Sequence, residues 1–207
     1  MSRSDDHFAT RRRVLRPETT VEHVDEFAKG FQWPMVGVTE RDREAGTDGE
    51  VVWQADGHAL GKQVLKTGSL HYRVDAMFGI GYILFTGRPR GIVETLASTA
   101  AQALKPWTVE ELCQAFDQAQ DPRGRGQAAL RLGLAAPAKP DQQVFKRIGA
   151  ALADEDARVR YASVFAASYT RYEALLPNLR EIAARDGEGF LRDRAAATLR
   201  SMDGVKV

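Results

Sequence analysis

The residues that could do chemistry in this chain are few, and their spacing predicts no metal site. None of the four histidines pairs with another at the His-x₃-His spacing of a zinc ligand set, and there is only one cysteine, Cys113. The histidines are His7, His23, His58 and His71. Cys113 falls on the apolar side of a predicted helix, which favours a small core residue over a nucleophile. We therefore expect no metal, no cofactor and no enzymatic activity.

Two glycine-bearing segments match phosphate-binding loops only in part. Residues 57–63 have three residues between their glycines where a phosphate loop has four, and Gln63 replaces the Ser or Thr that binds Mg²⁺. Residues 79–81 begin a dinucleotide fingerprint, but Leu84 stands where its third glycine belongs. Adjacent carboxylates such as Glu110 and Glu111 lie at predicted helix starts, where negative charge complements the helix dipole. None of these segments predicts a catalytic or nucleotide site.

A contact patch is the most site-like feature, and it lies on one predicted strand. Apolar residues alternate along residues 70–76 with His71, Arg73 and Asp75, so these three polar side chains share one strand face. A cation, an anion and the nearby Trp53 together have the composition of a protein-binding surface. A plain solvated sheet face is the alternative. We predict four binding residues in this patch: His71, Arg73 and Asp75 on the strand face, and Trp53 beside it.

The elements that must position this patch predict an α+β domain over residues 1–107. A capping box at residues 19–22 opens an amphipathic helix that ends near Gly30. Short apolar runs of period two, separated by Gly- and Asp-bearing turns, then predict four strands: residues 35–38, 51–53, 70–77 and 80–85. Pro89 opens a second helix that runs to about Leu104. We expect an antiparallel sheet with both helices on one face.

A short motif recurs three times in the C-terminal half. It occupies residues 124–128, 159–163 and 191–195, at offsets of 35 and 32 residues. Each copy has an early arginine, followed three residues later by a small residue; the arginines are Arg125, Arg160 and Arg192. A helix pair of this length buries its apolar face only by stacking on its neighbours. The sequence therefore predicts an all-α helical repeat domain over residues 108–207.

This half resembles the HEAT-like repeat family, which also occurs in bacterial phycobilin-lyase-type repeat proteins. Besides the recurring arginine, the resemblance rests on an acidic residue before each first helix: Asp121, Asp154 or Asp156, and Asp186. It covers about residues 108–207 and implies stacked helix pairs, in which the inward arginine bridges neighbouring Asp or carbonyl groups. Residues 1–107 are assigned to no family.

The expected function is binding without catalysis, because a stacked array makes a long exposed surface. We expect a bacterial protein-binding module, and our narrower hypothesis is an immunity protein that neutralises a toxin. One alternative is a nucleic-acid-binding or repair-associated protein, whose basic inner surface would be formed by the second helices of the array. The other alternative, drawn from the phycobilin-lyase resemblance, is a lyase or ligand-handling protein. The array residues that we predict at a binding surface are Lys146, Arg147, Arg171 and Arg180.

Charge and cysteine content restrict the partner and the compartment. Residues 1–120 carry 14 basic and 17 acidic side chains, and residues 121–207 carry 15 and 11, so their net charges are −3 and +4. These values are far from the dense basic stripe of a dedicated nucleic-acid binder. A single cysteine excludes an internal disulfide, and the sequence shows no signal-peptide or membrane-spanning run. We expect a soluble cytoplasmic chain with a protein partner and no membrane contact; its oligomeric state is open.

Overall fold

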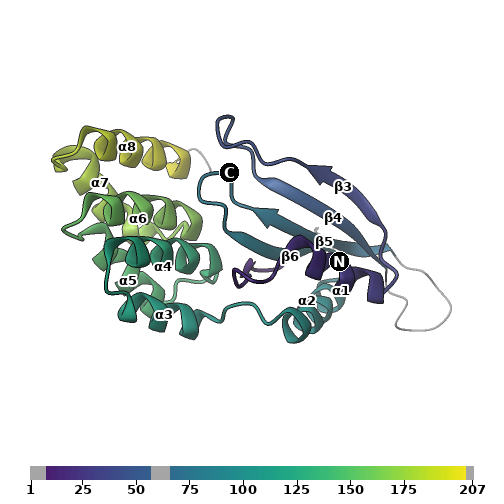
Figure 1. Cartoon of the computed structure of the whole chain (residues 1–207). Coiled ribbons are helices and arrows are strands. Elements are labelled where there is room, and N and C mark those ends of the chain that lie inside the picture. The colour runs from purple at the N-terminus through teal and green to yellow at the C-terminus, as the bar shows by residue number, and fades with distance from the viewer. Residues whose placement is uncertain (1–7, 57–65, 204–207) are drawn as a thin grey trace, which may run out of the picture. The chain divides into compact units, whose positions relative to one another are not determined.

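The computed structural model describes residues 8–56 and 66–203, and the chain divides into two compact units, Met1–Trp107 and Thr108–Val207 (Figure 1). We call these units the head and the array. The phosphate-loop-like residues 57–63 lie outside the described residues, as do His7 and His58. Within the described ranges, no helix combines the length and the apolar character needed to cross a membrane.

The head is built on an antiparallel sheet. Its strands are β1 (Phe8–Ala9), β2 (Arg13–Val14), β3 (Met35–Thr39), β4 (Gly49–Asp56), β5 (Lys66–Val74) and β6 (Gly81–Gly87). They lie in the order β1-β6-β5-β4-β3, and β2 also pairs with β6. This order makes β3 an edge strand that is bonded to β4 on one side.

Two helices, α1 (Val21–Gly30) and α2 (Arg90–Leu104), cover one face of this sheet (Figure 1). That face carries Trp53, Leu70 and Phe85, which are aligned across β4, β5 and β6 by the strand register. Val24 of α1 and Val93 of α2 are fully buried in the same core cluster. The predicted α+β fold class of the head is therefore confirmed.

The array consists of two layers of helices (Figure 1). In the first layer α4 (Pro122–Ala135), α6 (Ala157–Thr170) and α8 (Gly189–Asp203) pack side by side. The second layer contains α3 (Val109–Gln118), α5 (Gln142–Leu152) and α7 (Leu176–Arg185), which is preceded by a 3₁₀ turn, Glu173–Leu175. The predicted helical repeat architecture is confirmed.

Close backbone approach explains the glycines within α4. A Cβ atom added to Gly133 would lie 2.6 Å from both the Cα and the carbonyl oxygen of Ala166 in α6. One added to Gly126 would lie 3.3 Å from the Cβ of Ala162. Glycine weakens a helix by roughly 0.5–1 kcal/mol relative to alanine. At these two positions, its small size lets α4 and α6 pack together.

Candidate interaction surfaces

Glu50 joins two of the predicted binding residues on the sheet face opposite the helices. Its Oε1 lies 2.7 Å from Nδ1 of His71 and accepts a hydrogen bond from Nε of Arg73, also at 2.7 Å. The other imidazole nitrogen, Nε2, lies 2.9 Å from the hydroxyl oxygen of Thr86. The register of β4 on β5 explains this cluster, because it places Glu50 directly opposite Arg73. His71 and Arg73 were predicted from the sequence, whereas Glu50 and Thr86 were not.

Electrostatics keep the Glu50 carboxylate and the Arg73 guanidinium ionised. Partial burial raises the pKa of Glu50, but hydrogen bonds from Arg73 and His71 outweigh it and hold that pKa below its ordinary value. Partial burial lowers the pKa of Arg73, and the hydrogen bond to Glu50 outweighs it in the opposite direction. The two charges therefore neutralise each other across the strands. Their arrangement is typical of a cross-strand polar network that stabilises a sheet.

Trp53 belongs to the core, so its prediction as a member of this patch is wrong. It pairs with Leu70, whereas its neighbour Val52 pairs with His71, and alternation along a strand directs Trp53 and His71 to opposite faces. Trp53 is 0% exposed, and its Nε1 donates to Oδ1 of Asp25 at 2.9 Å. A fully buried indole with a satisfied N–H does not anchor a partner.

Asp75 is also a structural residue, and its prediction on the polar face is wrong. The strand β5 ends at Val74, so the alternation that the sequence suggested stops one residue earlier. Asp75 is buried, and its Oδ1 accepts the backbone N–H of Phe78 at 2.7 Å. This hydrogen bond stabilises the turn that leads towards β6.

The four predicted cations of the array come from different elements. Lys146 of α5 and Arg180 of α7 are exposed on second-layer helices. Arg171 is also exposed, but it ends the first-layer helix α6 in a left-handed conformation, so its assignment to a second helix is wrong. Arg147 of α5 is already bound, because its Nε donates to Oδ1 of Asp117 at 2.9 Å.

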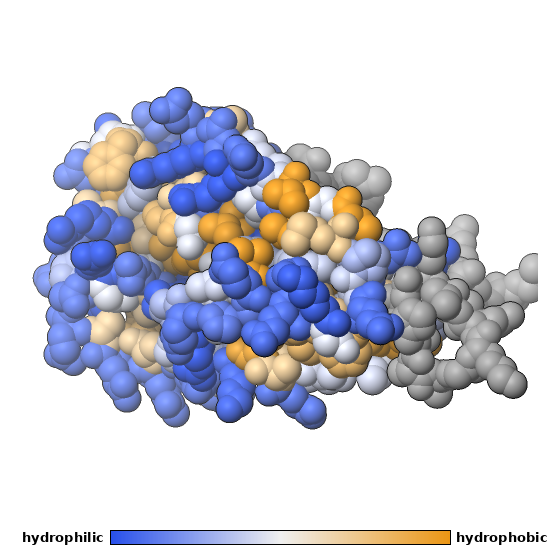
Figure 2. Space-filling view, turned by 45° about the vertical axis from the view of Figure 1, so that its right-hand side comes forward, coloured by the Kyte–Doolittle hydropathy of each residue, from blue (hydrophilic) through white to orange (hydrophobic). Residues whose placement is uncertain are grey.

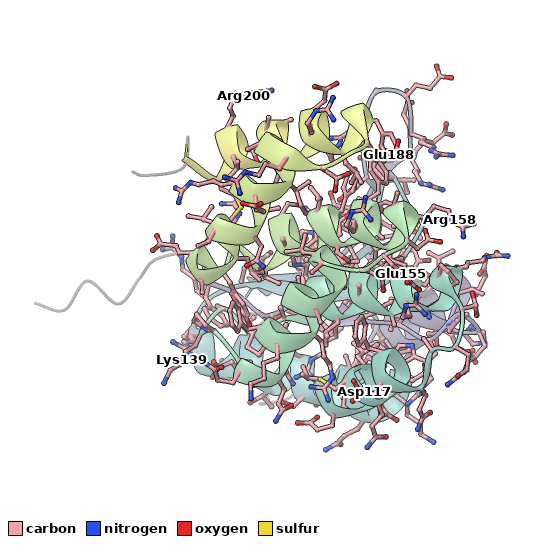
Figure 3. All side chains as sticks on the ribbon, turned by 90° about the vertical axis from the view of Figure 1, so that its left-hand side faces the viewer. Asp117, Lys139, Glu155, Arg158, Glu188 and Arg200 are labelled. Atoms are coloured by element: carbon pink, nitrogen blue, oxygen red, sulfur yellow. The ribbon has the colours of Figure 1, made fainter. Side chains whose placement is uncertain are left out.

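Carboxylates lie among these cations in the second layer. Asp117 of α3, labelled in Figure 3, raises the pKa of Arg147 by accepting its hydrogen bonds. Glu110 of α3 and Glu181 of α7 are exposed. The layer therefore presents both signs of charge, whereas the nucleic-acid alternative requires a basic surface.

Salt bridges join consecutive units of the array, as the family resemblance implied. Arg125 of α4 donates to the Asp154 carboxylate through Nε at 2.9 Å and Nη2 at 3.3 Å. Arg160 of α6 donates to Asp186 through the same two nitrogens, at 2.7 and 3.0 Å. Each pair is bidentate and links a first-layer helix to the loop before the next one. We call these two pairs the Arg–Asp ladder.

Each acceptor aspartate of the ladder also shapes the start of the next helix. The Oδ1 atoms of Asp154 and Asp186 each accept the backbone N–H of the residue two positions further on, at 2.9 Å. The hydrogen bond from Arg160 holds the pKa of Asp186 below its ordinary value, against the opposing effect of burial. The two loops lie along one edge of the array, where Figure 3 labels Glu155 and Glu188.

The edge strand β3 carries an exposed apolar surface that sequence analysis did not single out. Met35 is 49% exposed, Val36 55% and Val38 65%, and Phe31 at the end of α1 is 40% exposed. The apolar run was visible in the sequence, but only the strand order shows that it lies at an edge. Figure 2 shows hydrophobic side chains exposed among hydrophilic ones on one face of the molecule. We call Phe31, Met35, Val36 and Val38 the apolar edge.

Comparison with known proteins identifies the array and leaves the head unassigned. The family model for HEAT repeats matches residues 109–200. Neither the curated proteins nor the solved structures contain a match to the chain. HEAT repeats commonly mediate protein–protein interaction. The stacked helices, the Arg–Asp ladder and the family match agree: residues 109–200 are a HEAT-like repeat region.

Proposed function

We propose that this chain is a non-catalytic module that binds a protein partner through the apolar edge. The observation that carries the proposal is the exposure of Met35, Val36 and Val38 on an edge strand. Large apolar side chains that are exposed close together on a folded protein are typical of a binding site. The HEAT-like region supports the same class of function, because such repeats commonly mediate protein–protein interaction.

The backbone of β3 favours a partner that contributes an extended, uncharged segment. Residues 35–39 contain neither a proline nor a charged side chain, two devices that protect sheet edges from pairing; the strand does carry a register shift between Met35 and Gly37. An added strand would bond to the free side of β3 and pack apolar side chains against Met35 and Val38. A nucleic acid offers no comparable apolar strand.

The two alternatives from the sequence have weaker support. Nucleic-acid binding would draw on array cations, but Arg125, Arg147 and Arg160 are each paired with a carboxylate. A lyase or ligand-handling role rests on the phycobilin-lyase resemblance alone, and pigment absorbance in the purified protein would support it.

Neutralisation of a toxin is the narrower hypothesis within the protein-binding class. The bacterial immunity role predicts that the captured partner is toxic when it is expressed without this chain. Co-expression of the two would then restore growth. A harmless partner would restrict the proposal to a general binding module.

Affinity capture from a lysate of the source organism tests the proposed function. We expect the wild-type chain to retain a reproducible protein, and we expect Val38→Lys to lose it because a charge would be buried in an apolar contact. Gln102→Lys is the matched control, because Gln102 is an exposed polar residue on α2. Equal capture by both variants would contradict the role of the apolar edge.

The expected lack of catalysis can be tested at one chain of contacts. The carboxylate of Glu50 lies next to the imidazole of His71, which lies next to the hydroxyl of Thr86. That connectivity is shared with hydroxyl nucleophiles that are activated by a histidine. We expect a fluorophosphonate probe to leave Thr86 unlabelled. Covalent labelling that disappears in Thr86→Val would overturn the non-catalytic assignment.

A further inference from the structure

Arg192 of α8 repeats the backbone anchoring of Arg160 in α6. The Nη1 of Arg160 donates to the carbonyl oxygens of Asp154 and Glu155, at 2.9 and 3.0 Å. The Nη1 of Arg192 donates to the carbonyl oxygens of Asp186 and Gly187, at 2.6 and 3.2 Å. In both cases the acceptors stand six and five residues before the arginine. The two guanidinium groups are therefore anchored by the same local structure.

The two arginines differ in the partners of their other guanidinium edge, which is formed by Nε and Nη2. Nε and Nη2 of Arg160 hold the Asp186 carboxylate, whereas no carboxylate among residues 8–56 and 66–203 bonds to Nε or Nη2 of Arg192. The repeated motif thus supplies three arginines for two acceptor aspartates. One positive charge remains at the α8 end of the ladder.

The surroundings of Arg192 suit a macromolecular ligand. The Arg192 side chain is exposed, and Phe190 on the same helix is 50% exposed. The Phe190 ring packs edge-on against the Tyr161 ring, with 5.6 Å between the ring centroids. Arginine and aromatic side chains are both enriched in protein interfaces, and one of each is exposed in the first turns of α8. A Cβ atom added to Gly189 would lie 3.5 Å from Nη2 of Arg192. Because Gly189 has no side chain, it does not block a ligand from reaching Nη2.

We propose that Arg192 binds an aspartate in an Asp-x-Asp or Asp-x-Glu turn at a helix start of a protein partner. The ladder supplies the template, because Asp154 and Asp186 each accept an arginine and the backbone N–H two residues further on. An end-to-end stack of a second array does not fit, because Ala119 stands where the first unit would need that aspartate. The proposal rests on the proposed function and adds a second contact, with acidic chemistry, to the apolar edge.

Side-chain NMR of the full chain tests the proposal with a defined probe. The probe is the acetylated and amidated peptide of residues 184–191, which contains the Asp186 turn, and its control carries Asp186→Asn. We expect the peptide to shift the Nε–Hε signal of Arg192 saturably, and the Asn peptide to bind about tenfold more weakly or worse, since it loses a charge-assisted bidentate pair. The Arg200 signal, from another exposed arginine of α8, is expected to stay in place.

Equal shifts with both peptides, or equal movement of Arg192 and Arg200, would show unspecific charge attraction and overturn the proposal. Arg192→Lys gives a second test, because lysine keeps the charge but loses the bidentate edge. If the partner is captured equally by wild type and Arg192→Lys, and the peptide does not bind, the Arg192 site fails while the proposed function stands. If the peptide binds but no partner is captured, the proposed function fails while the site stands.

Discussion

At the scale of single residues, the Arg–Asp ladder shows how one arginine unites two repeat units. Arg160 bonds two carbonyl oxygens of its own loop and both carboxylate oxygens of Asp186 in the next loop. The Asp186 side chain is only 4% exposed while Arg160 is in place, so its carboxylate relies on protein partners more than on water. A buried ion pair adds little net stability over an apolar pair, but the removal of one partner is costly.

Arg160→Ala is therefore expected to lower the free energy of unfolding by about 2–3 kcal/mol, because it leaves the Asp186 carboxylate buried without its cation. Arg158→Ala is the matched control, since Arg158 is 78% exposed and its pair with Asp156 is local to the start of α6. Urea denaturation followed by circular dichroism measures both changes. Equal unfolding curves for the two variants would place Arg160 outside the ladder.

The same pair predicts a loss of stability in acid. The folded-state pKa of Asp186 lies below its ordinary value of 3.8, so the unfolded chain takes up the proton first as the pH falls. The contribution of Asp186 is complete above that ordinary value and disappears as the pH drops through the folded-state pKa. We expect Asp186→Asn to unfold at a lower urea concentration at pH 7, with a smaller difference at pH 3. A difference that grows in acid would contradict the ion pair.

At the scale of elements, small residues decide how closely α4 and α6 approach. Gly133→Ala places a methyl group against the backbone of Ala166. We expect the free energy of unfolding to fall by about 3 kcal/mol, the upper end of the range for overpacking. Gly149→Ala in α5 is the control, because a Cβ there meets nothing within 4 Å. The free energy of unfolding of Gly149→Ala should rise by up to about 1 kcal/mol, because alanine has the higher helix propensity. Thermal melts measure both variants. A Gly133→Ala variant that melts at the wild-type temperature would contradict the close contact between α4 and α6.

The helices and strands could largely be predicted from the sequence, because capping residues and apolar periodicity are local signals. The three arginines of the repeat were visible for the same reason. The cluster around Glu50 was not, because Glu50 and Arg73 meet only through the register of β4 on β5. Strand order likewise made the Met35–Thr39 segment an edge, and no local pattern states the order of strands. Trp53 shows the same limit, since its face depends on its partner Leu70.

At the scale of the whole molecule, charge argues for a protein partner over a nucleic acid. The net charge is +1, and the arginines of the ladder are neutralised by aspartates. At 50 mM salt, we expect the Kd for mixed-sequence duplex DNA to exceed about 10 µM. Unspecific DNA binders reach lower Kd values through phosphate contacts. Fluorescence anisotropy measures this. Tight binding that weakens steeply with added salt would favour the nucleic-acid alternative.

Calorimetric titration of the captured partner into the purified chain measures directly whether the apolar edge is the binding site. We expect Val38→Lys to weaken the affinity at least about tenfold, equivalent to about 1.4 kcal/mol, and Gln102→Lys to bind like wild type. Native circular dichroism of both variants excludes unfolding as the cause. Wild-type affinity in Val38→Lys would contradict a binding site at the apolar edge.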